Sequence, residues 1–345
     1  MKALLTTGNK SVSIGETETP RPGEGEILVK VTYVAQNPTD WKMLDVPAGR
    51  VVGCDFAGTV ADSNGSQWRE GQRIAGWVHG RATDPPRGAF AEYLVTESEM
   101  VFPVPDDITD QQAATISAPF ATAVQALVQR LKLPEPSDPA KTALPLLVNG
   151  GSTSVGMYAI QLGKLAGLYV VATGSRKNHT LLKSLGADIV VDYSTKNWPK
   201  RVRRITNDSL EHVLDCVGEF STILSTASAL SSTKGGHILT LLPVGPVRES
   251  GEVDIEKVKL ESTLAYTVFG RPISSLYDDF DNFTPTSEDK AIWEKYLVML
   301  PELLRSGKIK PNNVREMGTI DDIPAGFEAQ KKGDVRAEKL VYKVM

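Results

Sequence analysis

A glycine-rich turn is the part of this sequence whose residue types point most directly to chemistry. The stretch Asn149 to Gly156 follows the apolar run Leu146 to Val148, and residues 155 to 166 have helical periodicity. Glycines let the backbone turn sharply and approach a pyrophosphate, while the first amides of a helix point at the anion. Gly151 and Gly156 hold the first and last positions of a GxGxxG pattern, with Thr153 in the middle. The pattern predicts a dinucleotide-binding site, and the alternative is an ordinary loop. The residues expected to contact the dinucleotide are Gly151, Ser152, Thr153, Ser154, Val155 and Gly156.

The loop after the next apolar run indicates which dinucleotide is bound. A protein that binds NAD usually carries Asp or Glu about 20 residues beyond the glycines, where the carboxylate accepts hydrogen bonds from the ribose. This sequence has Ser175, Arg176 and Lys177 there instead. Arg and Lys make charge-assisted hydrogen bonds to phosphate oxygens, so the loop predicts NADPH rather than NADH. The alternative is that the two cations are merely solvated.

The cysteines and histidines do not form a set of zinc ligands. The cysteines, Cys54 and Cys216, have no CxxC spacing, and the histidines are His79, His179, His212 and His237. A zinc site needs three or four such side chains converging on the metal. We therefore expect no metal site and no disulfide framework, with Cys54 as a small buried apolar side chain.

Two patterns along the chain indicate the elements that must position these residues. The first 120 or so residues carry short β-branched runs divided by glycine and proline, which predict a mostly antiparallel β domain; examples are 27–31, 58–60 and 90–95. From about Leu144, apolar runs alternate with helical stretches, which predicts βαβ units and a parallel sheet. The strands expected in this sheet are 146–148, 169–172, 189–191, 212–215, 237–241 and 264–268. About six strands is the size of a doubly wound nucleotide-binding sheet.

Two further segments bear on domain organisation. The proline-rich run Leu133 to Pro139 suits either an interdomain linker or a surface loop of the second domain. Near the end, the run Ser287 to Asp289 caps an amphipathic helix predicted to end near Gly307. The tail is too short for a domain of its own, so we expect it to pack on the N-terminal domain.

Composition excludes several classes of protein. With 345 residues, 41% of them apolar, the chain is long enough for two domains, each with its own core. Lys and Arg number 38 against 42 Asp and Glu, so no overall positive field favours nucleic acid or an anionic membrane. No apolar run approaches the roughly 20 residues of a membrane span, and the first residues lack a signal-peptide pattern. We expect a cytoplasmic protein.

Several motifs, in this order and spacing, resemble those of the zinc-independent members of the medium-chain dehydrogenase/reductase superfamily. They are NPTDWK at 37–42, GCDFAG at 53–58, GAFAEY at 88–93, GGSTSVG at 150–156, LDCVG at 214–218, YTVFG at 266–270 and AEKLVY at 337–342. The chain is similar to the quinone oxidoreductases and more similar still to the trans-acting enoyl reductases of fungal polyketide synthases. The resemblance implies an α/β fold: a GroES-like β-barrel catalytic domain at 1–120, an NADPH-binding Rossmann domain with a doubly wound parallel sheet at 121–270, and a C-terminal segment at 271–345 that returns to the catalytic domain.

The resemblance also implies a reaction. A hydride from NADPH goes to the β-carbon of an α,β-unsaturated thioester, and the resulting enolate is protonated at the α-carbon. By the same resemblance, Lys42 and Thr122 lie near the nicotinamide and the substrate carbonyl, where a cation and a hydroxyl stabilise negative charge. The alternatives are a surface pair between Lys42 and Asp40, and Thr122 as the N-terminal residue of a helix.

Further cofactor contacts are implied at the ends of the later strands. Tyr193 resembles the family tyrosine beside the adenosine phosphate, with Lys196 adding charge, although an aromatic residue at a strand end can also simply cover the core. Phe269 and Gly270 lie where family members line the nicotinamide pocket, and Leu241 to Pro243 are expected to add backbone contacts there. The basic run Lys200 to Arg204 is either a dock for an acidic carrier domain or a solvated helix face.

These observations favour an NADPH-dependent enoyl reductase that acts in trans on a polyketide intermediate tethered to an acyl carrier protein. One alternative is a free-standing NADPH quinone or enone reductase. Another is a catalytically silent NADPH-binding partner protein, against which the polar residues Lys42 and Thr122 argue. The resemblance favours a monomer.

Overall fold

The computed structural model describes residues 1–83, 86–273, 279–281 and 283–345. The chain divides into two compact units, which we call unit 1 (Met1–Ala118 with Glu294–Met345) and unit 2 (Pro119–Trp293). The C-terminal part of unit 1 therefore begins at Glu294, and the described residues between 271 and 293 belong to unit 2. The proline-rich run Leu133 to Pro139 lies inside unit 2, where it is a loop.

Unit 1 is built on a sheet of mainly antiparallel strands, as its short β-branched runs predict. The strand order is β16-β17-β3-β4-β5-β9, and β8 also pairs with β3. Ile27, Val29 and Val31 alternate along β3 and are fully buried in the core. The strands are β1 (Lys2–Thr6), β2 (Val12–Glu16), β3 (Glu26–Ala35), β4 (Asp55–Asp62), β5 (Arg73–Trp77), β6 (Ala82–Thr83), β7 (Pro86–Arg87), β8 (Tyr93–Glu97), β9 (Val101–Pro103), β16 (Val314–Thr319) and β17 (Lys339–Lys343).

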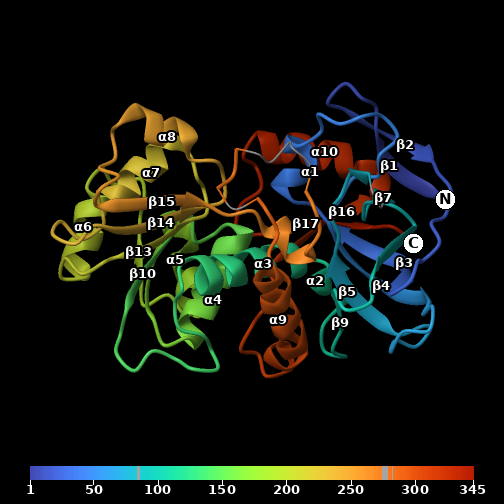
Figure 1. Cartoon of the computed structure of the whole chain (residues 1–345), viewed down its shortest axis with the longest axis horizontal. Coiled ribbons are helices and arrows are strands. Elements are labelled where there is room, and N and C mark those ends of the chain that lie inside the picture. Colours follow the sequence, from blue (N-terminus) through green and yellow to red (C-terminus); the bar gives the residue numbers. More distant parts are fainter. Residues whose placement is uncertain (84–85, 274–278, 282) are drawn as a thin grey trace. The chain divides into compact units, whose positions relative to one another are not determined.

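The last strand of the chain joins the sheet formed by the first hundred residues. Figure 1 shows the red C-terminal strand among the blue N-terminal strands of this unit. Strand β17 runs antiparallel to β3, with Val341 opposite Ala35. Leu340 and Tyr342 of β17 are buried in the same apolar cluster as Val31. The C-terminal strand therefore completes the core of unit 1.

Unit 2 contains the parallel sheet that the alternating pattern predicts. In the described part of the chain it has six strands in the order β12-β11-β10-β13-β14-β15, all parallel. This is the doubly wound order, in which the chain changes direction between the neighbours β10 and β13, and ligands bind beyond the carboxyl ends of those strands. The strands are β10 (Pro145–Asn149), β11 (Tyr169–Thr173), β12 (Ile189–Val191), β13 (His212–Asp215), β14 (Gly236–Thr240) and β15 (Val258–Ser262).

The sixth strand is not where the sequence pattern predicts it. Residues 264–268 were expected to form it, but Ala265–Phe269 is a 3-10 helix, η3, and the strand is Val258–Ser262. Strand β15 lies at the edge of the sheet, and buried positions alternate along it with more exposed ones. Because Lys259 and Glu261 occupy the more exposed positions, the strand has no continuous apolar run in its sequence. The apolar run at 264–268 instead reflects a buried helical turn, in which Tyr266 and Val268 face the interior.

The helices of unit 2 pack closely on its sheet. In α4, a Cβ on Gly163 would lie 3.1 Å from Val170 and 3.2 Å from Leu146, so the missing side chain lets the helix approach the strands. The helices of both units are α1 (Pro38–Lys42), α2 (Asp110–Ala113), α3 (Ser117–Val124), the π-helix η1 (Gln125–Arg130), α4 (Ser154–Leu165), η2 (Arg176–Asn178), α5 (His179–Ser184), α6 (Trp198–Ile205), α7 (Phe220–Ala227), α8 (Gly245–Ser250), η3 (Ala265–Phe269), α9 (Ser287–Arg305), η5 (Ile320–Asp322) and α10 (Ile323–Lys331). Helix α9 begins at Ser287, directly after its cap Thr286, so the cap lies one residue before the predicted run Ser287 to Asp289. The helix ends two residues before Gly307. None of the helices in the described ranges combines the length and the apolar character that a membrane span needs.

Candidate functional site

The turn between β10 and α4 has a backbone path that side chains would block. Gly150 has a φ of +74°, and a Cβ on Gly156 would lie only 2.4 Å from the carbonyl oxygen of Gly150. Thr153 caps α4, because its Oγ1 accepts a hydrogen bond of 3.0 Å from the Gly156 amide. Ser154 and Val155 are the first two residues of α4. The backbone amides in the first turn of a helix have no hydrogen-bond acceptor within the helix. A narrow turn that leads into such amides fits a pyrophosphate.

Buried polar side chains join this turn to the ends of the neighbouring strands. The hydroxyl of Thr173 in β11 donates to Oδ1 of Asn149 at 2.6 Å and accepts from the Gly150 amide at 2.9 Å. The Asn149 amide group in turn donates to Asp215 at the end of β13, over 2.8 Å. Asp215 and Thr173 are fully buried, and Asn149 is nearly so. The path of the glycine turn is therefore fixed from both flanking strands.

The three residues predicted to recognise the 2′-phosphate follow β11 directly. Gly151 donates to the carbonyl of Thr173 at 2.9 Å, so the glycine turn and the start of this loop lie together. Ser175 is half-buried, whereas Arg176 and Lys177 are exposed. Neither cation forms an ion pair with any residue that the structure describes. Both side chains are thus exposed to solvent, and the charge of Arg176 also acts on the Asp192 carboxylate.

One carboxylate near this loop was not predicted. Asp192 follows β12, the strand beside β11, and its pKa is lowered, mainly by hydrogen bonds from the amide and hydroxyl of Ser194 and to a smaller extent by the charges of His179 and Arg176. Strand β11 ends at Thr173 and no Asp or Glu follows it in the loop, but the sheet brings the Asp192 carboxylate from the next strand within electrostatic range of Arg176.

The other predicted cofactor contacts follow β12 and β14 or lie at the end of η3. Tyr193 is 51% exposed, so it does not serve to cover the core. Leu241 directly follows β14 and is half-buried. Phe269 is buried at the end of η3, with the Arg271 guanidinium 5.2 Å from the centroid of its ring, and Gly270 has a φ of +65°. All these residues belong to unit 2, and each follows a strand of the parallel sheet in the chain.

Lys42 ends the short helix α1 of unit 1. Its side chain is exposed, and Nζ lies 5.6 Å from the centroid of the Trp41 ring. The alternative of a surface pair with Asp40 is wrong, because the Asp40 carboxylate is fully buried, accepts a hydrogen bond from the Asn37 amide and lies 4.0 Å from Arg81. The ammonium group of Lys42 is therefore held beside an aromatic ring and not neutralised by Asp40.

Thr122 lies in the last turn of α3 and is half-buried. The alternative in which it is the N-terminal residue of its helix is wrong, since α3 begins at Ser117. The start of α3 is fixed by Asp55 of unit 1, whose Oδ1 accepts from the Ala118 amide at 2.7 Å. This bond lies within unit 1, to which Ala118 belongs, and Thr122 follows four residues later in the same helix.

The residues around Cys54 do not fit a zinc ion. Cys54 is fully buried, as predicted, and the adjacent Asp55 binds the ammonium group of Lys339 and, at 2.8 Å, the amide group of Asn37. The charge of this carboxylate is therefore already balanced by a buried lysine. Within residues 1–83, 86–273, 279–281 and 283–345, no three His, Cys, Asp or Glu side chains are grouped as metal ligands.

Sequence reasoning missed two sets of buried polar residues. Asn149 and Asp215 each end an apolar run, and a polar residue at the last position of a buried strand is a signal that was available. The second set is centred on Gln125 and Asp289, which are 164 positions apart. No local pattern connects them, so only the fold could identify that contact.

Comparison with known proteins agrees with this architecture. Residues 23–106 match the family described as the alcohol dehydrogenase GroES-like domain, and residues 154–260 match that described as zinc-binding dehydrogenase. The latter description names a metal for which the described residues offer no ligand set.

Full-length relatives are also found. The chain is 35% identical to the trans-enoyl reductase ACTTS2 of Alternaria alternata, over 99% of this chain and 98% of that protein. It is 36% identical to the trans-enoyl reductase traG of Penicillium crustosum, over 94% and 92% respectively. Among solved structures, the quinone oxidoreductase from Coxiella burnetii has the same fold, with a TM-score of 0.73 at 22% identity over 100% of this chain and 99% of that one. This chain therefore belongs to the medium-chain dehydrogenase/reductase superfamily, with the trans-enoyl reductases as relatives.

Proposed function

We propose that this protein is an NADPH-dependent reductase of α,β-unsaturated thioesters, acting in trans on polyketide intermediates tethered to an acyl carrier protein. The observation that carries the proposal is the identity of 35 to 36% to proteins named trans-enoyl reductases, over nearly the full length of both chains. The quinone oxidoreductase supports the fold alone at 22% identity, so reduction of free quinones is the alternative to be tested.

In this proposal the dinucleotide binds beyond the carboxyl ends of the parallel strands of unit 2. The glycine turn and the first amides of α4 hold the pyrophosphate. Ser175, Arg176 and Lys177 bind the 2′-phosphate, for which the lack of ion pairs at the two cations is the supporting observation. Tyr193 and Lys196 border the adenosine end, and Leu241, Phe269 and Gly270 border the nicotinamide.

Bound NADPH supplies a hydride to the β-carbon of the substrate. The protein must then stabilise the negative charge that develops on the thioester oxygen, and Lys42 and Thr122 are the residues proposed to do so. Lys42 contributes a positive charge that Asp40 does not neutralise. Thr122 contributes a hydroxyl on a helix whose start is hydrogen-bonded to Asp55.

The proposal includes independence from zinc. The pairing of Asp55 with Lys339 supports it, because a buried lysine supplies the positive charge beside Cys54. Elemental analysis of the purified protein is expected to find far less than one zinc per chain, and activity is expected to persist in a chelator.

The test is an NADPH oxidation assay with two acceptors, a pantetheine-linked enoyl thioester and a simple quinone. The proposal predicts a higher kcat/KM for the thioester, because binding of the pantetheine arm contributes to the specificity for a tethered substrate. A preference for the quinone would support the alternative reductase. No oxidation with either acceptor, despite tight NADPH binding, would support the silent partner protein.

A further inference from the structure

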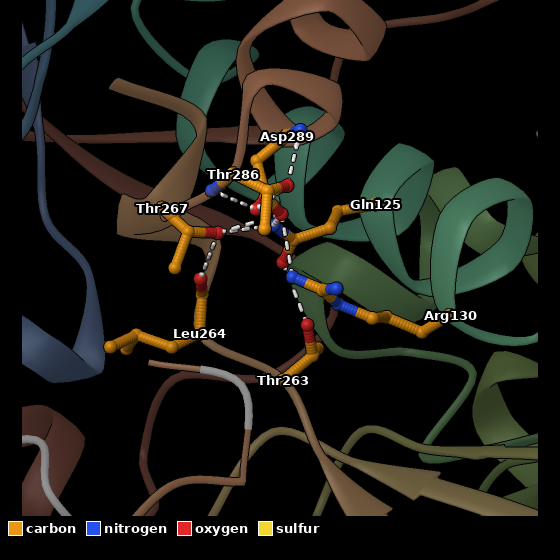
Figure 2. Close-up of polar contacts among 7 residues, drawn as sticks. All are labelled: Gln125, Arg130, Thr263, Leu264, Thr267, Thr286 and Asp289. Carbon is orange, nitrogen blue, oxygen red and sulfur yellow. Dashed lines mark hydrogen bonds and ion pairs between the residues drawn. The ribbon is translucent and has the colours of Figure 1, made fainter. Parts of the chain in front are cut away.

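A buried polar cluster in unit 2 lies behind the segment that carries Phe269 and Gly270. Its centre is the Asp289 carboxylate, fully buried at the start of α9. Oδ1 of Asp289 accepts hydrogen bonds from Gln125 at 2.9 Å, Arg130 at 2.5 Å and Thr267 at 3.0 Å (Figure 2). Oδ2 accepts from the amide and the hydroxyl of Thr286, which caps α9. We call Gln125, Arg130, Thr263, Thr267 and Asp289 the Asp289 cluster.

The π-helix η1 allows Gln125 and Arg130 to reach the same carboxylate. Two residues five positions apart in an α-helix, with 3.6 residues per turn, point about 140° away from each other. In a π-helix the hydrogen bonds run between residues five apart, so such residues lie one turn apart on nearly the same face. The bond of 2.9 Å from the Leu131 amide to the Ala126 carbonyl has this spacing. Figure 2 shows both side chains extending from this helix to Asp289.

The segment from Thr263 to Gly270 depends on this cluster for its position. Strand β15 ends at Ser262, and the first backbone bond after it is from the Thr263 amide to the carbonyl of Thr240. The Thr263 hydroxyl donates to the Gln125 side-chain carbonyl at 2.7 Å, and the amide group of Gln125 donates to the Thr267 hydroxyl at 2.6 Å. One buried glutamine thus connects the residue that follows β15 and the middle of η3 to Asp289 of α9.

Aromatic contacts join the same elements to the helix of the glycine turn. The Phe120 ring of α3 lies edge-on to Trp293 of α9, with centroids 6.3 Å apart, and to Tyr158 of α4, with centroids 5.6 Å apart. All three side chains are fully buried in unit 2. The cluster therefore holds the 263–270 segment against a frame that also contains the pyrophosphate turn.

We propose that the Asp289 cluster positions the Thr263 to Gly270 segment for the nicotinamide half of the cofactor, with Thr267 as its positioning residue. This inference rests on the proposed function, because it requires Phe269 and Gly270 to border the nicotinamide. In this proposal the cluster residues act through the segment that they hold and not on the reacting atoms. Their effect is on the alignment of the nicotinamide and not on the binding of the adenosine end.

The experiment compares Thr267→Val, which keeps the shape but removes the hydroxyl, with Thr267→Ser, which retains it. Thr226→Val is the matched control, since Thr226 is equally buried and its hydroxyl makes the same kind of bond to a carbonyl three residues earlier, within α7. The measurements are kcat with an enoyl pantetheine at saturating NADPH, the affinity for 2′,5′-ADP as a probe of the adenosine end, and the unfolding temperature.

Thr267→Val is expected to lower kcat about five- to tenfold while the affinity for 2′,5′-ADP stays within about twofold of the parent value. Thr267→Ser is expected to restore kcat, and Thr226→Val to lower the unfolding temperature without changing kcat. If Thr267→Val does not fold, Thr263→Val removes a bond to the same glutamine from the other end of the segment and carries the same expectation.

Two results would overturn the inference while leaving the proposed function intact. One is a Thr267→Val kcat equal to that of Thr226→Val, and the other is a failure of Thr267→Ser to restore activity. A parent protein that neither binds 2′,5′-ADP nor oxidises NADPH would instead refute the proposed function, and the inference with it.

Discussion

The hydroxyl of Thr173, at the end of β11, lies 2.6 Å from Oδ1 of Asn149, at the end of β10. The same hydroxyl accepts a hydrogen bond from the Gly150 amide. One side chain therefore connects the ends of two adjacent strands to the start of the glycine turn. Polar groups buried this deeply are stabilising only when they are paired. The relationship explains how the turn keeps its narrow shape without strand pairing of its own.

The first prediction concerns this shape. Gly156→Ala places a Cβ 2.4 Å from the Gly150 carbonyl oxygen, so the turn must widen. We expect NADPH affinity to fall more than about tenfold, as measured by fluorescence titration. Gly245→Ala is the control, because a Cβ there meets nothing within 4 Å. Equal affinities in the two variants would show that the turn does not bind the cofactor.

The second prediction concerns the choice of cofactor. If one or two of Ser175, Arg176 and Lys177 hydrogen-bond the 2′-phosphate, each such bond contributes about 1.5 to 3 kcal/mol. NADPH is then preferred over NADH by roughly ten- to a hundredfold or more. The double variant R176Q/K177Q is expected to weaken NADPH binding and leave the NADH dissociation constant nearly unchanged.

A control for net charge is available on α6. Lys200 and Arg201 are also exposed, so K200Q/R201Q makes the same change of charge in another helix. This variant is expected to bind both dinucleotides as the parent does. A parent protein with equal dissociation constants for NADPH and NADH would refute the role of the three loop residues.

The third prediction concerns Lys42 and Thr122. Lys42→Met and Thr122→Val should each lower turnover much more than NADPH affinity, because these residues are proposed to act on the substrate. Lys331→Met is the control for Lys42, since Nζ of Lys331 lies 5.8 Å from the same Trp41 ring. Thr122→Ser is the control for Thr122. If Lys42→Met and Lys331→Met have the same kcat, Lys42 has no role in the chemistry.

The fourth prediction is a pH dependence of stability. Burial raises the pKa of Asp40 from its ordinary value of 3.8 to about 6, against the opposing effect of Arg81. Between these two values the native protein binds the proton more tightly than the unfolded chain, so this group stabilises the fold less as the pH rises. Relative to Asp40→Asn, the parent should gain on the order of 1 kcal/mol in free energy of unfolding when the pH is lowered from about 8 to about 5. Denaturant unfolding of both proteins at the two pH values measures the free energy of unfolding. The same change with pH in the parent and in Asp40→Asn would contradict the prediction.

Much of the fold could be predicted from the sequence because its signals are local. Apolar runs followed by helical periodicity identified β10 to β14 in order, and the glycine turn was placed correctly between β10 and α4. The sixth strand was misplaced because the apolar pattern reports burial and not strand geometry. Strand β15 is a half-exposed edge strand, whereas the buried run at 264–268 forms the helical turn η3.

Less of the candidate site was accessible to sequence reasoning. The residues of the glycine turn and the β11 loop follow one another along the chain, so their proximity could be inferred. Asp192 approaches Arg176 only because β12 pairs with β11, and Asp289 reaches Gln125 only because α9 packs on η1. Contacts of this kind depend on the tertiary fold and have no spacing that a sequence pattern can reveal.

The most direct test of the proposed function follows the hydride itself. The purified protein is given NADPH that carries deuterium at both C4 positions, together with an enoyl pantetheine thioester, and the product is examined by mass spectrometry and NMR. We predict a saturated thioester with a single deuterium at the β-carbon and a solvent proton at the α-carbon. A product without deuterium, or no saturated thioester although a quinone is reduced, would contradict the assignment as an enoyl reductase.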